Sequence, residues 1–409
     1  MPELKDLVRK SPPKQKRTDP PWQGPDGVGD NGGITFSLLS RFLVCRERFR
    51  LLVMEGLKPA DDFHHRLEYG QMWHTCEEAM AGEKRVSASL FAWKPALVKY
   101  TEKLLRRYPL KQEQVEHWYR VCEVQFPLYV RHWAKHKDTR ARTPLLQEQV
   151  FDVPYQLPSG RCVRLRGKWD AVAKRGNGIW LQENKTKSEI DEVSIRRQLK
   201  FDLQTMLYLV SLQGIKSDLR SMLFLQEDRG RDASIQGINP YNVVRRPLSG
   251  GKGSISRHVA TKGSKCPRCK GNLVGKDGST CEKCGGSGRV GAKPAESLDS
   301  FYNRLSGIIA GSPDDFFMRW EVPITARDIQ RFKEEFLNPC LEFLCCWWDW
   351  VTTESVQADV MARNCHWRHP FGVWNALDEG GSSELDNYLE TGSESGLQRV
   401  DNLFPELEQ

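Results

Sequence analysis

The segment from Arg161 to Leu212 constrains the fold of this chain more than any other. In residues 163–170, charged side chains alternate with apolar or small ones, which is the period of a half-buried strand. The sequence RGNG follows at 175–178 and is typical of a tight hairpin turn. Residues 179–187 then return as a second strand, and residues 194–212 have helical periodicity. The sequence predicts a β-hairpin followed by a helix, as in an α/β fold.

Three charged residues are expected to gather at one end of this hairpin: Asp170, Glu183 and Lys185. Two carboxylates brought together repel each other, so they need a cation between them or a shared proton. Oxygen ligands of this kind suit Mg²⁺. A lysine two residues after the second carboxylate can orient or deprotonate an attacking water, or offset charge that builds on a phosphate. The pattern therefore favours metal-dependent hydrolysis of a phosphate ester.

These residues resemble a known family. GKWD at 167–170, followed by ENK at 183–185, resembles the core motif of the PD-(D/E)XK nucleases. QTMLY at 204–208 is similar to the Q-x-x-x-Y element of the RecB-type exonuclease branch. In that branch an earlier helix supplies a histidine ligand, and EYGQMWHTCEEAM places His74 in a matching context. SLLSRFLVCRERFRL at 37–51 resembles the opening helix of the branch.

The resemblance implies a restriction-endonuclease-like α/β fold, in which helices flank a mixed sheet. It implies a Mg²⁺- or Mn²⁺-dependent deoxyribonuclease, acting as an exonuclease in DNA recombination, repair or phage DNA metabolism. The expected site residues are catalytic Asp170, Glu183 and Lys185; metal-ligating His74, Asp170 and Glu183; and DNA-positioning Gln204, Tyr208 and Arg197. The implied partner is DNA, with recombination or replication proteins as further partners.

Simpler readings exist for each residue taken singly. Glu183 and Lys185 could form an exposed ion pair, which contributes little to stability. Tyr208 alone would be a packing residue. Glu148, on an expected first strand at 145–157, could support the metal site, but a surface position is the ordinary expectation for a glutamate.

Composition limits the remaining possibilities. The chain has 409 residues, with thirteen Trp and seventeen Phe, so it can bury a sizeable core. No run of about 18 apolar residues is present, so we expect no membrane span. The N-terminus has no hydrophobic stretch typical of a secretory signal. Twelve cysteines without such a signal favour reduced thiols or metal ligands over disulfides. We therefore expect a cytoplasmic protein of a bacterial or phage-infected cell.

Charge and composition divide the chain. We expect a disordered arm rich in Pro, Gly and basic residues at 1–33 and an acidic disordered tail at 378–409. Between them, residues 34–377 carry 54 basic and 39 acidic residues, a net charge of +15, which suits a polyphosphate partner. The nuclease core is expected at 34–227, with a helical wall at 34–143 and the catalytic sheet and helix at 144–227. A basic insertion at 228–297 precedes the C-terminal part of the core, 298–377.

The insertion contains two C-x-x-C pairs, Cys266 with Cys269 and Cys281 with Cys284. This spacing matches the tetrahedral thiolate cage of a structural zinc ribbon. The surrounding residues are rich in glycine and poor in apolar side chains, so a bound Zn²⁺ would supply much of the folding free energy. The basic character of the insertion makes it either a DNA clamp or a structural insertion.

Further elements are expected in chain order. A first helix begins near residues 35–37, and a second carries His74 and ends near Gly82. Pro95, Pro109 and Pro127 are expected to separate two or three helices in residues 87–136. Later come a buried strand at 219–226, a strand at 316–325, and a long helix at 326–351.

Two other functions fit part of the pattern. An iron–sulfur nuclease of the AddB or CRISPR-adaptation type would use Cys45 with cysteines near the C-terminus. The candidates there are Cys340, Cys345, Cys346 and Cys365; the first three share one apolar helix and cannot converge on one cluster. A non-catalytic zinc-ribbon DNA-binding protein is the other alternative, but it would have no use for clustered carboxylates facing phosphate.

Overall fold

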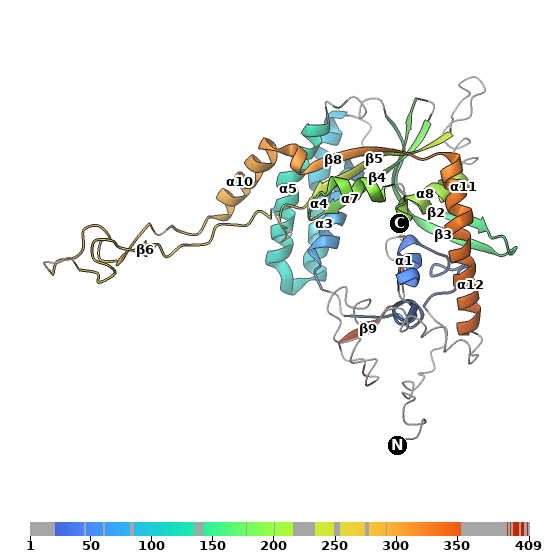
Figure 1. Cartoon of the computed structure of the whole chain (residues 1–409), viewed down its shortest axis with the longest axis horizontal. Helices are drawn as coiled ribbons and strands as arrows, with labels where there is room; N and C mark the ends of the chain where they lie inside the picture. The colour runs from blue at the N-terminus through green and yellow to red at the C-terminus, as the bar shows by residue number, and fades with distance from the viewer. Residues whose placement is uncertain are drawn as a thin grey trace, which may run out of the picture.

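The structure is a computed structural model of the whole chain (Figure 1). It describes residues 21–44, 46–59, 62–81, 86–134, 136, 142–176, 178–199, 201–215, 234–248, 254–274, 278–291 and 293–352. It also describes residues 391, 393, 396–400, 402–404 and 407.

A five-stranded mixed sheet lies at the centre of the molecule, with strand order β2-β3-β4-β5-β8. The strands are β2 (Thr143–Gln156), β3 (Cys162–Arg175), β4 (Gly178–Lys187), β5 (Ser234–Arg245) and β8 (Phe317–Pro323). Only β4 and β5 run parallel; the other neighbouring pairs are antiparallel. The predicted α/β architecture, a mixed sheet flanked by helices, is therefore confirmed.

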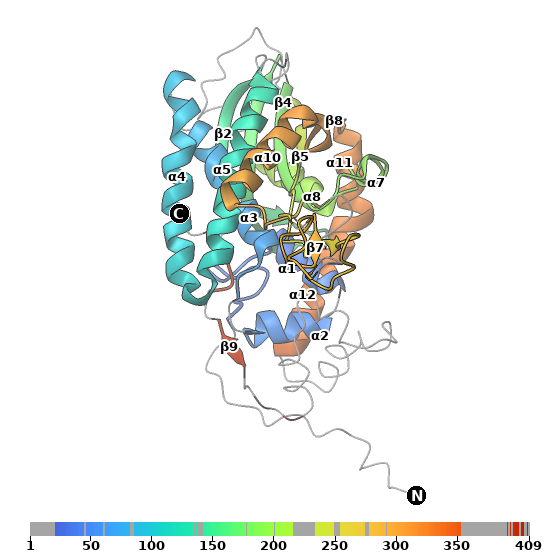
Figure 2. The ribbon, with the colours of Figure 1, turned by 90° about the vertical axis from the view of Figure 1, so that its left-hand side faces the viewer.

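Helices form a layer on each side of the sheet (Figures 1 and 2). One layer contains α1 (Phe36–Val44), α7 (Glu192–Gln198), α8 (Leu203–Gly214), α11 (Ala326–Phe332) and α12 (Asn338–Thr352). This layer also contains three short helical segments: α2 (Arg46–Phe49), η2 (Arg50–Met54) and η5 (Lys333–Leu337). The opposite layer contains α3 (His65–Ala81), α4 (Val86–Arg107), η3 (Pro109–Lys111), α5 (Gln112–Ala134), α10 (Leu298–Gly311) and η4 (Pro313–Asp315). Each layer buries its own apolar cluster against the sheet.

The hairpin that dominates the sequence forms as predicted. Arg175 pairs with Gly178, so the turn lies between these two residues, and Gly176 has φ +57°. This left-handed conformation favours glycine because a Cβ would clash with the backbone. Pairing between β3 and β4 continues to Ala171 and Gln182 and then stops. The two strands therefore separate immediately before Asp170 and Glu183.

The expected disorder of residues 1–33 is wrong for residues 21–33. Trp22 is fully buried, lies edge-on to Phe49 and donates from its indole N–H to the Gly33 carbonyl at 2.9 Å. Arg164 and Arg166 donate to carbonyl oxygens of this segment. A single large aromatic ring thus anchors a stretch whose composition suggests disorder. Residues 1–20 lie outside the described part of the chain.

Prolines mark fewer helix boundaries than expected. Pro95 lies inside α4 and Pro127 inside α5, while Pro109 begins η3. Burial of long apolar faces on both helices outweighs the loss of one backbone hydrogen bond at each proline. The long helix predicted at 326–351 forms as α11, η5 and α12, with the π-helical turn η5 in the middle. The strand predicted at 219–226 lies outside the described residues.

The boundary placed at residue 228 does not separate core from insertion. β5 begins at Ser234 and pairs with both β4 and β8, so it is an interior strand of the sheet. The inserted part is an arm, defined here as residues 254–297. The arm contains the short paired strands β6 (Ser264–Lys265) and β7 (Arg289–Val290). It projects from the body beside α10 (Figure 1).

Part of the acidic tail is ordered, contrary to the expectation for 378–409. β9 (Leu397–Arg399) pairs antiparallel with β1 (Leu57–Pro59). Phe404 and Leu407 are buried in the same cluster as Trp22, and the Arg166 guanidinium lies over the Phe404 ring. Residues 353–390 lie outside the described part of the chain. Among the helices that the structure describes, none is long and apolar enough to cross a membrane.

Candidate active site

Three side chains from three elements meet at the centre of the sheet: His74 of α3, Glu148 of β2 and Asp170 of β3. Each offers one ligand atom within 4.8 Å of the others. The Nδ1 atom of His74 lies 3.2 Å from Oε1 of Glu148 and 3.7 Å from Oδ1 of Asp170. Lys168 contacts the second oxygen of Glu148 at 2.9 Å. These are donor types that bind a divalent cation.

Backbone geometry explains the position of Glu148. Gln147 pairs with Ala171 and Gln149 with Trp169, so the register places Glu148 opposite Asp170. Glu148 has φ +46°, a conformation that is uncommon outside glycine, Asn and Asp. Its side chain is only 4% exposed. The ordinary expectation of a surface glutamate is therefore wrong, because a local backbone distortion accompanies burial of this carboxylate beside His74.

Glu183 and Lys185 lie beside this group on β4. Asp170 accepts a hydrogen bond from the backbone N–H of Asn184 at 2.7 Å, which the separation of β3 and β4 makes available. The ammonium of Lys185 pairs with Oε1 of Glu183 and donates to Oε1 of Gln204 at 2.6 Å. Glu183 is 1% exposed, and its Oε2 atom has no hydrogen-bond partner among the described residues. A buried carboxylate oxygen without a partner is costly unless a ligand supplies one.

Burial and neighbouring charges together shift the pKa values of these groups. It raises the pKa of Glu183 to about 8, against the lowering effect of Lys185, and it raises the pKa of Asp170. Burial would lower the pKa of His74, but Asp170 and Glu148 raise it to about 10. Burial would also raise the pKa of Glu148, yet its contacts with His74 and Lys168 lower it. The cluster therefore gathers three carboxyl groups in a low-dielectric setting, where a bound cation would stabilise their charged forms.

α8 holds the lysine in place. Asp202 caps this helix by accepting from the Thr205 N–H at 2.9 Å. In the first turn, Gln204 accepts from Lys185 and donates from its amide to the hydroxyl of Tyr208, one turn later, at 3.1 Å. Gln204 thus links the lysine to the buried tyrosine.

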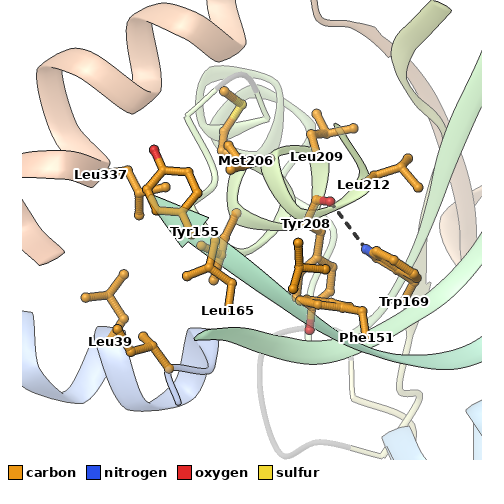
Figure 3. Packing of buried hydrophobic residues seen from close by; sticks show 14 of the residues in the cluster. Leu39, Phe151, Tyr155, Leu165, Trp169, Met206, Tyr208, Leu209, Leu212 and Leu337 are labelled. Carbon is orange, nitrogen blue, oxygen red and sulfur yellow. Dashed lines mark hydrogen bonds between the residues drawn. The ribbon is translucent and has the colours of Figure 1, made fainter. Parts of the chain in front are cut away.

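Tyr208 is itself part of the core. Its ring packs edge-on against Phe151, with centroids 5.5 Å apart, and its carbonyl accepts from the Trp169 indole at 3.3 Å (Figure 3). Tyr208 therefore combines packing with a hydroxyl that faces Gln204. A role in core packing and a role in positioning Gln204 are therefore compatible for this residue.

Arg197 does not share a helix with Gln204 and Tyr208. α7 ends at Gln198 and α8 begins at Leu203, and Arg197 is exposed on α7. The continuous helical periodicity of 194–212 does not reveal this break. Asp202 supplies the signal that could have done so, because aspartate is a preferred N-cap residue.

A model of the PD-(D/E)XK nuclease superfamily matches residues 34–269. The chain belongs to the PD-(D/E)XK nuclease superfamily. The match extends from just before α1 through β5 and into the arm, while β8, which completes the sheet, follows it in sequence. No curated protein matches the chain at a significant level.

This nuclease has a further buried carboxylate near His74, that of Glu77, which the sequence analysis did not single out. Glu77 lies one helical turn after His74 on α3, is 9% exposed, and accepts from the Tyr129 hydroxyl at 2.7 Å. Arg319 in turn donates to the same hydroxyl at 3.2 Å. Burial raises the pKa of Glu77 to about 7, against the hydrogen bond from Tyr129. Its spacing from His74 on one helix was the signal available in the sequence.

The nuclease also contains a four-cysteine group at the tip of the arm. The sulfur atoms of Cys266 and Cys281 are 3.9 Å apart, and those of Cys269 and Cys284 are 3.7 Å apart. Zinc–sulfur bonds of about 2.3 Å in a tetrahedron require sulfur–sulfur distances of about 3.8 Å. All four ligand atoms lie within 4.8 Å of one another. The cysteine group therefore fits a zinc ion.

The cysteines considered for an iron–sulfur cluster are only partly described. Cys340, Cys345 and Cys346 lie on α12, where Cys345 is buried and Cys346 is exposed. Cys45 and Cys365 lie outside the described residues. The absence of such a cluster stays a prediction.

Proposed function

We propose that this chain is a Mg²⁺-dependent deoxyribonuclease that hydrolyses phosphodiester bonds as an exonuclease of the RecB-type branch. The observation that carries the proposal is the convergence of His74 from α3 with Asp170, next to a lysine held by Glu183 and Gln204. An early-helix histidine and a Q-x-x-x-Y helix beside the carboxylates are the features by which this chain resembles that branch.

The residues fit a divalent cation. Asp170, Glu183 and His74 would hold it. Glu148 offers a further oxygen, since His74, Glu148 and Asp170 are the three residues whose ligand atoms lie within 4.8 Å of one another. The Oε2 atom of Glu183 supports this most directly, because it is buried and has no hydrogen-bond partner among the described residues. A bound Mg²⁺ supplies Lewis acidity toward the phosphate and lowers the pKa of water bound to it; Mn²⁺ has similar ligand preferences.

The remaining chemistry falls to the protein's own groups. The Lys185 ammonium would orient the attacking water and offset negative charge that develops on the phosphate. Gln204 keeps Lys185 in place and is itself braced by Tyr208. Arg197, exposed on α7, would contact the DNA strand as a phosphate-binding cation. Binding of DNA also fits the net positive charge of residues 34–377.

The proposed setting is DNA recombination, repair or phage DNA metabolism in the cytoplasm of a bacterial or phage-infected cell, with recombination or replication proteins as partners. This setting rests on the resemblance to the RecB-type branch. It follows from the nuclease assignment only if DNA ends are the preferred substrate.

The test compares Asp170→Asn and Lys185→Ala with the unmodified protein on end-labelled linear and circular DNA, in Mg²⁺, Mn²⁺ or EDTA. Each variant should lose cleavage by about 10³-fold or more, because each removes a group that acts on the transition state. DNA binding should change little. Lys174→Ala, at a half-exposed position farther along β3, is the matched control and should cleave normally.

The linear substrate should be degraded and the circular one spared. Cleavage at the unmodified rate in Asp170→Asn or Lys185→Ala would reject the site assignment. Equal cleavage of circular DNA would reject the exonuclease assignment while leaving the nuclease intact.

A further inference from the structure

The arm, residues 254–297, carries its four-cysteine tip well away from the sheet (Figure 1). Its outgoing and returning stretches are joined by a bridge between Thr261 and Lys293 and by the pairing of β6 with β7. An extended chain spans at most about 3.3 Å per residue, so the eleven steps from 254 to 265 reach up to ~36 Å. The tip can therefore meet a ligand that the active site does not touch.

The root of the arm is fixed to the body. Glu296 accepts two hydrogen bonds from the Arg304 guanidinium, at 2.8 and 2.7 Å, and one from the His258 N–H at 3.0 Å. Arg304 also donates to the Ser256 carbonyl at 2.9 Å. Arg304 belongs to α10, whose Phe301 and Leu305 are buried against the α3–α5 layer. The arm is thus held in a defined direction, which a passive linker would not require.

The tip has almost no apolar interior. Its buried residues are cysteines, joined by partly buried Cys284 and Val290. Leu273 and Val274 are the exposed large apolar side chains among the tip's described residues, and two aliphatic side chains are too few to anchor a hydrophobic protein interface of the usual kind. What the tip mainly presents to a partner is charge.

The arm from 254 to 296 contains nine Lys or Arg and three Asp or Glu, a formal charge of +6. The two described carboxylates are already engaged: Glu282 pairs with Arg268, and Glu296 pairs with Arg304. A zinc ion with four thiolates carries a charge of −2, which still leaves the arm positive. Five exposed lysines form no ion pair with any described residue: Lys262, Lys265, Lys270, Lys283 and Lys293.

We propose that the arm binds the phosphate backbone of the DNA substrate, at a distance from the bond that is cleaved. This inference rests on the proposed function, which makes DNA the substrate. Lysines without acidic partners release counterions when they meet phosphates, and this binding is independent of base sequence. A fixed arm that grips DNA away from the cleavage site lets the enzyme hold long substrates through successive cuts.

The test measures how DNA affinity depends on salt. The triple variant Lys265→Gln, Lys270→Gln, Lys283→Gln is compared with the unmodified protein on a duplex of about 40 base pairs in EDTA-free buffer containing Ca²⁺. Each lost phosphate contact reduces the slope of log K against log salt by about 0.9, so the slope should fall by about 2 to 3. The matched control replaces the same three lysines by arginine, which keeps the charge and should keep the slope.

A second measurement separates this inference from the proposed function. A duplex of about 8 base pairs is roughly 27 Å long, which is shorter than the ~36 Å that the outgoing stretch of the arm alone can span. The Gln variant should cleave it at the unmodified rate, whereas KM for the longer duplex should rise by about tenfold or more. Zinc content should be unchanged, which shows that the tip is still folded.

An unchanged salt slope in the Gln variant would overturn the proposal. So would an equal loss of cleavage on short and long duplexes. If the unmodified protein cleaves neither duplex, the proposed function fails, and the salt slope still decides whether the arm binds DNA.

Discussion

The sheet and the arm differ in what holds them together. The sheet lies between two apolar clusters and buries Trp22, Trp73, Trp169 and Trp347 almost completely. The arm has only a small cluster at its tip, in which three cysteines are buried and Cys284 and Val290 are partly buried. Burial of a large aromatic side chain contributes several kcal/mol, whereas a glycine-rich segment without such side chains gains its order from metal ligation.

The two regions therefore differ in the kind of polar group that they can accommodate. In the sheet, Asp170, Glu148 and Glu183 stay buried because the surrounding apolar packing offsets the cost of desolvating them. In the arm, lysines remain in water and cost nothing to expose. Chemistry that needs desolvated charge therefore belongs in the sheet, and contact with a hydrated polyanion belongs on the arm.

Removal of zinc should have the largest effect, because it should unfold the arm and leave the sheet folded. Cys266→Ser should lose the metal and unfold the arm, since structural zinc contributes about 10–16 kcal/mol to small domains. The sheet should keep its thermal unfolding midpoint, because Ile255, at the root of the arm, is the only described arm residue that packs against either apolar cluster. Metal analysis, limited proteolysis and thermal unfolding measure these outcomes.

The matched control for this prediction is Cys346→Ser, at an exposed position on α12, which should retain zinc. A midpoint that falls together with the zinc content would show that the arm and the sheet unfold as one unit.

Truncation of Trp22 should destabilise the body and leave the arm unchanged. Trp22→Ala should lower the free energy of unfolding of the body by about 3–5 kcal/mol, because it leaves a cavity in the main apolar cluster. Zinc content of the arm should not change. Val28→Ala, in the same segment but 92% exposed, should be neutral in urea denaturation. A neutral Trp22→Ala would mean that residues 21–33 contribute nothing to the core.

The smallest expected effect concerns Glu77 and depends on pH. Burial raises the pKa of Glu77 from its ordinary value of 4.5 to about 7, so between these values the folded state binds a proton that the unfolded state does not. The free energy of unfolding therefore falls as pH rises from about 4.5 to about 7. Glu77→Gln should remove roughly 2–3 kcal/mol of that fall.

Denaturation of both proteins at pH 5 and pH 8, without added divalent cation, measures this difference. The Gln variant should gain stability relative to the unmodified protein as pH rises. Parallel pH profiles would place the titration elsewhere in the cluster.

Much of the fold could be predicted where local pattern and tertiary packing agree. The alternation in residues 163–170 and the turn at 175–178 act within a few residues, so β3 and β4 follow from them directly. β5 was missed because Ser234–Arg245 lies next to a basic, glycine-rich stretch, and an interior strand reads as a mixed run when its neighbours supply the burial. Trp22 was missed because one ring, rather than composition, decides the order of its segment.

The candidate site shows the same limit. Asp170, Glu183 and Lys185 are close in sequence, and the structure brings them together. Glu148 depends on a positive φ that no periodicity reveals. Glu77 depends on which side of α3 faces the sheet, a tertiary fact. The break between α7 and α8 depends on a helix cap at Asp202, which a continuous apolar pattern conceals.

The pairing of β1 with β9 has a consequence for how the protein is made. The Arg399 guanidinium donates to the Glu55 carbonyl, 344 positions earlier in the chain. At about 5–20 residues per second, a ribosome needs roughly 17–70 s to synthesise that interval. During this time β1 has no strand partner, and the pocket that receives Phe404 stays open. The nascent chain therefore completes its body long after the β3–β4 hairpin has emerged, and it leaves apolar surface uncovered until then.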